Sequence, residues 1–203
     1  MLRSFPTTLA VAVAGASLGS GAMPSALAQG SLFTAIPVDL SSFVLVAAPI
    51  GSSSSSQLNI YEQRTSKRPC FAVEGAAPAV VNPLLATFDF TGICNRYIDG
   101  NGYSLRIGGD DFGTRYRLSV VKSKDDVKLL AVGAEGSHLV ARSGGYGDGF
   151  IKLDFEPGWT LMRRQYGTRA LGHLYVFRDA WPESEVEPDA EPEAEGQAAE
   201  SES

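Results

Sequence analysis

Residues 43–61 read FVLVAAPIGSSSSSQLNIY, and this stretch indicates the fold class. Its first part, residues 43–50, is an apolar run with the length of a β-strand. Gly51 and the serines at 52–56 end that run, because small polar side chains cannot build a core and compete for backbone hydrogen bonds. Residues 58–61 then alternate in polarity, as a strand with one buried face does. The stretch therefore predicts a β-hairpin with a serine-rich loop.

The same rhythm of short strands continues along the chain. Most candidate strands are separated by Gly, Asp, Asn or Pro, and no stretch of twelve residues has clean helical periodicity. Only Asn82 and Pro83 have the character of a helix start, for a single turn. The further candidate strands are 70–74, 86–90, 103–107, 116–121, 127–132, 138–141, 150–155, 160–164 and 173–177. We therefore predict a mainly β, single antiparallel sandwich or barrel-like domain over residues 29–180.

One pattern occurs twice within this domain. Residues 102–105 (GYSL) precede 112–115 (FGTR), and residues 158–161 (GWTL) precede 166–169 (YGTR). Each copy also follows an Asp-Phe pair, at 89–90 and at 154–155. The pattern favours two related β-units that bury one face against each other. The alternative is a chance similarity between hairpins of biased composition.

The N-terminus has the character of an export signal. Arg3 is the only charged residue before Asp39, and residues 9–18 are apolar and rich in Ala and Val. Ala26 and Ala28 have the small side chains of a signal-peptidase site, so residues 1–28 are predicted to be a cleavable signal peptide. The apolar run is shorter than the roughly 20 residues of a membrane span. We expect an exported protein, periplasmic, cell-surface or extracellular, without a transmembrane segment after cleavage.

The C-terminus differs in composition from the rest of the chain. Residues 181–203 contain nine of the 23 acidic residues and no basic residue. They lack apolar periodicity and cannot bury enough surface to offset their ordering entropy, so a disordered acidic tail is predicted. The remaining 14 acidic and 16 basic residues nearly balance once the signal peptide is removed. This balance provides no basic stripe, and nucleic acid is not an expected partner.

The chain has two cysteines, Cys70 and Cys94. An even number in an oxidising compartment favours a disulfide. Their spacing matches no zinc motif, and only His138 and His173 are available to complete such a site. We therefore predict a Cys70–Cys94 bridge.

The sequence offers little support for an enzyme. Residues 15–19 satisfy the Gly-x-Ser-x-Gly pattern of serine hydrolases but fall within the predicted signal peptide. His173 lies in an apolar strand pattern, which favours a packed residue over a catalytic base. No phosphate-binding loop and no dinucleotide-binding glycine motif are present. These observations favour a non-enzymatic protein.

Acidic residues near glycines allow three interpretations. Asp99 and Asn101 precede the candidate strand at 103–107, Asp110 and Asp111 follow it, and Asp148 lies between two glycines. Such residues are typical of tight turns. Oxygen ligands on a flexible loop are also what calcium requires, which makes Asp99, Asn101, Asp110 and Asp111 a candidate metal set. Paired carboxylates also support glycoside hydrolysis when they face each other.

Aromatic and arginine residues provide candidate ligand contacts. Aromatic rings can stack on sugars while guanidinium groups donate to hydroxyls or carboxylates, although in a β domain such residues are more often core or cross-strand pairs. The candidates are Tyr103, Arg106, Trp159, Arg163, Tyr166 and Arg169, with Tyr146 as a further aromatic residue.

Several segments resemble a known family. They are residues 46–51 (VAAPIG), 68–70 (RPC), 83–94 (PLLATFDFTGIC), 101–106 (NGYSLR) and 171–175 (LGHLY). Together they resemble an uncharacterised family of exported cyanobacterial proteins, a domain of unknown function. The resemblance runs from about residue 43 to 178 and implies export and one domain, with no established activity.

The sequence thus favours an exported, non-enzymatic envelope or extracellular domain that binds a surface glycan or protein. A carbohydrate-active hydrolase that uses paired carboxylates and a calcium-dependent structural module are the alternatives. No cofactor other than calcium is indicated.

Overall fold

A computed structural model describes residues 31–52 and 54–182 of the chain. The predicted signal peptide, and the acidic tail beyond Pro182, lie outside these residues. The strands are β1 (Thr34–Pro37), β2 (Phe43–Pro49), β3 (Ser56–Gln63), β4 (Ala72–Glu74), β5 (Val80–Asn82), β6 (Cys94–Tyr97), β7 (Tyr103–Ile107), β8 (Asp110–Asp111), β9 (Tyr116–Lys122), β10 (Val127–Gly133), β11 (Gly136–Arg142), β12 (Ile151–Phe155), β13 (Thr160–Tyr166) and β14 (Arg169–Arg178). Two short 3₁₀ helices, η1 (Leu40–Ser42) and η2 (Leu84–Thr87), complete the described elements.

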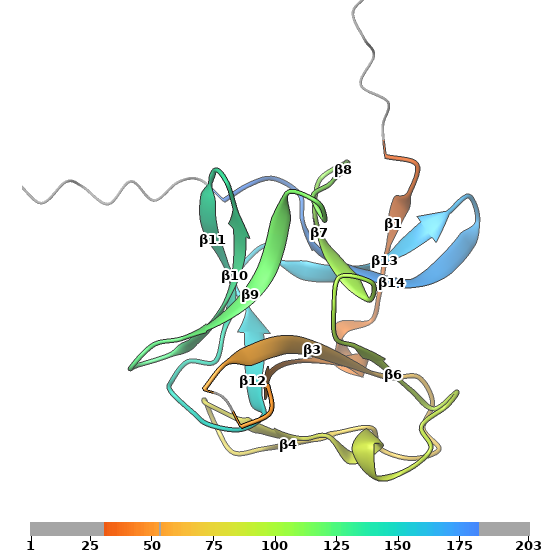
Figure 1. The fold of residues 1–203 in the computed structure, drawn as a ribbon. Helices are drawn as coiled ribbons and strands as arrows, with labels where there is room; N and C mark the ends of the chain where they lie inside the picture. The colour runs from red at the N-terminus through yellow and green to blue at the C-terminus, as the bar shows by residue number, and fades with distance from the viewer. Residues whose placement is uncertain (1–30, 53, 183–203) are drawn as a thin grey trace, which may run out of the picture.

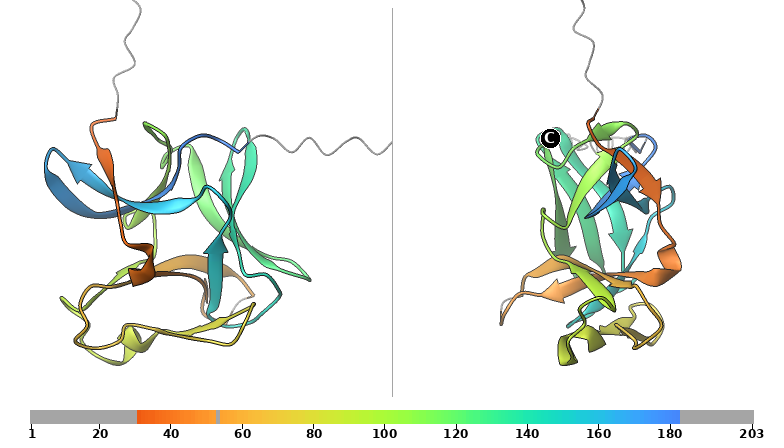
Figure 2. Two further views of the ribbon diagram at one scale, coloured as in Figure 1. Left: turned by 180° about the vertical axis from the view of Figure 1, so that it is seen from behind. Right: turned by 90° about the vertical axis from the view of Figure 1, so that its right-hand side faces the viewer.

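The strands form two curled sheets around a common core (Figures 1 and 2). One sheet has the order β1-β13-β14-β7-β8, and the other has the order β6-β3-β2-β12-β11-β10-β9, with β5 and β4 attached at β12. The predicted mainly β, antiparallel class is therefore confirmed. One pair departs from it, because β7 and β14 run parallel. Their long connection provides the crossover that a parallel pair needs.

The serine-loop hairpin is present as β2 and β3, which pair from Phe43↔Glu62 to Pro49↔Ser56. The apolar run in β2 is continuous because both faces of this strand are buried. Leu45 and Ala47 point into the main core, whereas Val44 and Val46 point into a second, smaller core. Burial on two faces replaces the alternating pattern by a continuous one.

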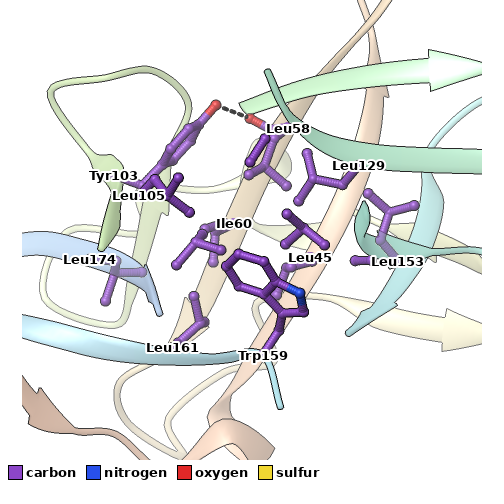
Figure 3. Close-up of a cluster of buried hydrophobic side chains, with 14 of the residues drawn as sticks. Leu45, Leu58, Ile60, Tyr103, Leu105, Leu129, Leu153, Trp159, Leu161 and Leu174 are labelled. Atoms are coloured by element: carbon purple, nitrogen blue, oxygen red, sulfur yellow. Dashed lines mark hydrogen bonds between the residues drawn. The ribbon is translucent and has the colours of Figure 1, made fainter. Parts of the chain in front are cut away.

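The main core lies between the two sheets (Figure 3). Leu58 and Ile60 of β3 meet Leu105 of β7 and Leu161 of β13 there, and all four are at most 1% exposed. Tyr103 fills the space beside β3 and donates its hydroxyl hydrogen to the Leu58 carbonyl over 2.9 Å. Burial, with the nearby Asp99 carboxylate, raises the pKa of Tyr103 to about 12. Tyr103 is therefore a neutral core residue.

The smaller core is closed by the predicted disulfide. Cys70 and Cys94 are bonded, with their Cα atoms 5.9 Å apart, and both are at most 2% exposed. Val81 and Leu85 pack beside the bridge, with partly buried aromatic residues around them. The disulfide therefore joins the segment between β3 and β4 to the start of strand β6.

The structure corrects the prediction around residues 86–90. This segment was expected as a strand, but it contains the end of η2 and irregular chain. Pro83 precedes the helical turn, and Thr87 donates its hydroxyl hydrogen to the Leu84 carbonyl. Phe88 and Phe90 pack against the smaller core, so their apolar character reflects burial without a strand.

The two copies of the repeated pattern share a buried aromatic residue, Tyr103 in one and Trp159 in the other. Their later parts differ. Residues 166–169 form the turn between β13 and β14, whereas residues 112–115 connect β8 to β9, which lies in the other sheet. Trp181, predicted to begin the tail, instead packs against the main core.

Candidate functional site

The structure does not bring the six predicted ligand contacts together. Tyr103 and Trp159 are 8% and 5% exposed and belong to the main core, so neither offers a ring to a surface ligand. Arg163 is held by Glu62 at 2.6 Å and by the Tyr97 hydroxyl. The other three members lie outside the core. Arg106 donates to backbone carbonyls of Gly108 and Gly109, and Tyr166 and Arg169 are exposed at the β13–β14 turn.

The predicted metal residues also have other roles. Asp99 accepts a hydrogen bond from the Asn101 backbone N–H and thereby closes a turn. Asp110 is exposed, whereas Asp111 forms an ion pair with Arg164 over 2.6 Å. Within residues 31–52 and 54–182, no three His, Cys, Asp or Glu side chains are grouped as metal ligands. The turn interpretation accounts for Asp99.

A groove of about 800 Å³ opens where the serine loop meets the β9–β10 hairpin and the β11–β12 loop. We call it the serine–tyrosine groove. It is lined by Ser54, Ser55, Ser56, Val120, Val121, Lys122, Ser123, Lys124, Tyr146 and Asp148. Serine hydroxyls, one aromatic ring and charged groups of both signs therefore meet in one hollow.

Three of the lining side chains are linked to one another. Asp148 accepts hydrogen bonds at Oδ1 from the Tyr146 hydroxyl (2.9 Å) and from Lys122 (3.3 Å). Its Oδ2 has no partner among the described residues. The Tyr146 side chain remains accessible, and the residue is 48% exposed. The Asp148 carboxylate and its hydrogen bond raise the pKa of Tyr146, so the phenol stays protonated.

Asp126 holds the loop that carries Tyr146 and Asp148. Its Oδ1 accepts from the Ser143 hydroxyl (3.0 Å) and from the backbone amides of Gly144 (3.1 Å) and Gly145 (3.3 Å). Burial alone would raise the pKa of Asp126, but these hydrogen bonds outweigh it and lower the pKa. The aromatic ring of the groove is therefore presented by a loop that the β9–β10 hairpin fixes in place.

A second polar cluster lies on the outer face of the five-stranded sheet. Ser104 Oγ is 2.9 Å from His173 Nε2, and His173 Nδ1 is 2.9 Å from the Asn101 carbonyl. A carbonyl only accepts, so Nδ1 carries the proton and Ser104 donates to Nε2. Arg164 Nη2 lies 3.4 Å from the same hydroxyl. The arrangement resembles a nucleophile with its base.

This Ser–His pair is closed to ligands. Ser104 is 9% and His173 7% exposed, and none of the described hollows is lined by either residue. Gly113 lies directly over the serine, since a Cβ placed on it would be 2.9 Å from Ser104 Cβ. Asp111 and Arg164 complete the network, and Arg164 also packs on Tyr175. We therefore interpret the cluster as a structural network.

His173 is expected to make stability depend on pH. Burial lowers its pKa below the ordinary value near 6.5, and the neighbouring Arg164 charge acts in the same direction. As pH falls through 6.5, the unfolded chain gains a proton that the folded chain does not, so the free energy of unfolding falls. Urea unfolding at pH 7.5, 6.5 and 5.5 measures this decrease.

The matched variant is His173→Gln, which keeps one donor and one acceptor but does not titrate. Its stability is expected to change less over this range. The carboxylates Glu62, Asp111 and Asp126, whose pKa values are lowered, contribute only at more acidic pH. An equal pH dependence in both proteins would contradict a role for His173.

The sequence indicates only part of this groove. It marks Tyr146 and Asp148 as separate candidates and the serines only as a loop tip. Nothing in the order of the residues indicates that segments 54–56, 120–124 and 146–148 meet. The alternating pattern also gave no sign that Ser104 and His173 share one outer face.

Fold and groove together define a β-rich domain of two curled sheets with a polar surface groove beside an aromatic residue. A family model described as "Protein of unknown function (DUF3747)" matches residues 8–181, and the chain belongs to this family. No curated protein and no solved structure matches the chain significantly. Within the described residues, none of the helices has the length and apolar character that crossing a membrane requires.

Proposed function

We propose that the chain is an exported, non-enzymatic domain of the cell envelope or extracellular space that binds a surface glycan. The groove lined by Tyr146, Asp148 and the serine loop is the proposed site. The observation that carries this proposal is the Tyr146 ring, which is exposed yet fixed through its hydroxyl by Asp148. A positioned ring binds a flat apolar face at a low entropic cost.

The surroundings of the ring suit a sugar. A pyranose presents an apolar face of C–H groups and a rim of hydroxyls. The Oδ2 atom of Asp148 can accept from such a hydroxyl, and Lys124 is exposed without an ion pair among the described residues. Ser123 lines the same wall, and its hydroxyl is bonded to the Asp126 backbone. Hydrogen bonds to charged groups are the stronger ones, so this rim would orient the sugar.

The groove gives less support to the hydrolase alternative. Two facing carboxylates are required for that reaction. Asp148 is the only carboxylate among the described residues that line the groove. The nearby Asp126 does not line it, and its Oδ1 is occupied by Ser143 and backbone amides. A calcium-dependent module has no grouped ligand set in the described chain.

The test is the loss of glycan binding on Tyr146→Ala. Co-sedimentation with purified peptidoglycan sacculi, and affinity electrophoresis in neutral and uronate polysaccharides, give the affinity of residues 29–203. We expect the variant to bind the recognised polymer about tenfold more weakly, which corresponds to about 1.4 kcal/mol. Tyr146→Phe should retain part of the affinity, because the ring remains.

Tyr166→Ala is the matched control. Tyr166 is 54% exposed, similar to Tyr146, but lies at the β13–β14 turn away from the groove. Its removal should leave binding unchanged, and both variants should keep the melting temperature. Equal losses in the two variants, or no binding to any polymer, would refute the proposal.

A further inference from the structure

The acidic residues beyond Pro182 follow a regular spacing. From Glu183 to Glu195 every second residue is Asp or Glu, and no basic residue occurs from there to the C-terminus. In an extended segment, alternate side chains lie on one face. An extended conformation would therefore align seven carboxylates on one side, about 6.6–6.8 Å apart.

The structure fixes the point from which this segment starts. Trp181 packs on three rings, with centroid distances of 4.5 Å to His138, 4.9 Å to Tyr116 and 5.1 Å to Phe112. Figure 1 shows the last described residues passing beside β11. The carboxylate series thus begins two residues after an aromatic anchor on the β9–β11 surface.

Two hollows adjoin this anchor, and each is lined by one of the rings that contact Trp181. The first, of about 440 Å³, contains Tyr116 together with Arg115 and Arg117. The second, of about 760 Å³, contains His138, and Pro182 is part of its wall. Its charged lining residues are Arg142, Arg178, Glu135 and Glu156. The chain therefore enters the acidic segment at the rim of a hollow of mixed charge in which Arg178 is the arginine without a carboxylate partner.

Three arginines of these hollows lack carboxylate partners within the described chain. Arg115 lies over the Phe112 ring, Arg117 donates to Ser119, and Arg178 donates to the Pro157 carbonyl. None of the three forms an ion pair there, in contrast to Arg142, which is paired with Glu156. Arg115 and Arg117 are two positions apart, the same interval that separates the acidic residues. Charge complementarity is therefore clearest at the Arg115–Arg117 hollow, where none of the described lining residues is acidic.

From these observations we infer that the acidic segment 183–203 docks on its own domain, across the Arg115–Arg117 and Arg178 hollows. The contact is electrostatic and intramolecular. Twenty-one residues are more than long enough, since an extended residue spans about 3.3 Å. Arginine–carboxylate pairs at an exposed site are weakened by salt, so the docked segment should be released as ionic strength rises.

The direction of a size change with salt tests this inference. A docked segment is released by salt, so the radius of gyration of residues 29–203 should increase between 20 mM and 500 mM NaCl. An undocked acidic segment repels itself at low salt and should contract over the same range. Small-angle scattering measures the radius, and circular dichroism confirms that the domain stays folded.

Two variants of residues 29–203 sharpen the result. Arg115→Gln/Arg117→Gln/Arg178→Gln should reverse the salt response from expansion to contraction. The control Arg64→Gln/Lys67→Gln/Arg96→Gln removes the same charge from exposed positions elsewhere and should still expand with salt. Contraction in the unsubstituted chain, equal behaviour of both variants, or a concentration-dependent dimer at low salt would overturn the inference. None of these readouts depends on glycan binding.

Discussion

The variant Cys70→Ala/Cys94→Ala is expected to lose about 3–4 kcal/mol of unfolding free energy. The bridge closes a loop with a sequence separation of 24 residues, and a cross-link of that length removes about this much entropy from the unfolded chain. Its loss should also loosen the smaller core, because Val81 and Leu85 belong to the same buried cluster as the two cysteines. Urea unfolding followed by tryptophan fluorescence gives the difference.

The unsubstituted protein in a reducing buffer provides the comparison for this variant. Reduction removes the cross-link without deleting atoms from the core, so its effect should be similar to that of the double variant or somewhat smaller. A loss below about 1 kcal/mol in both cases would contradict this explanation of the stabilisation.

Arg163→Leu is expected to destabilise the domain by about 3 kcal/mol or more. Its guanidinium lies 2.6 Å from Glu62 and 3.1 Å from the Tyr97 hydroxyl, with side-chain exposures of 17% for Arg163 and 12% for Glu62. The pair joins β13 of one sheet to β3 of the other. Removing one partner leaves a largely buried charge without compensation, which costs about 3–5 kcal/mol.

A double variant separates this cost from lost packing. In Glu62→Gln/Arg163→Leu the amide introduced at position 62 can still accept from Asn95 and Tyr97 but carries no charge. It should recover about half of the lost stability in chemical denaturation. Arg169→Leu, at the exposed β13–β14 turn, is the control and should change stability by less than about 0.5 kcal/mol. No recovery in the double variant would contradict the explanation.

The fold could be predicted where local patterns and burial agree. The serine-loop hairpin, the strands near 103–107 and 127–132, and the disulfide follow from periodicity, turn residues and cysteine count. The failure at 86–90 has a physical origin. Aromatic residues there are buried by the smaller core, and burial alone does not require a strand.

The site was less predictable because tertiary packing creates it. Tyr103 and Trp159 are residue types that can form a surface platform for a ligand. The sequence does not show which face of their strands is buried, because polar and apolar residues occur on both faces. The groove combines the β9–β10 hairpin with the serine loop and the β11–β12 loop. These two loops are almost a hundred residues apart in the chain. Lys122 and Asp148, 26 residues apart, become partners in one groove only in the folded sheet.

The position of β14 has a consequence for the order in which this protein can be completed. It is the last strand in sequence, yet it lies between β13 and β7 inside the five-stranded sheet. Until residue 178 is available, β7 lacks its parallel neighbour and one wall of the main core stays open. A chain still emerging from a ribosome therefore cannot complete this sheet. Contacts between residues so distant in sequence also form slowly, so the pairing of β7 with β14 is expected to be a late step of folding.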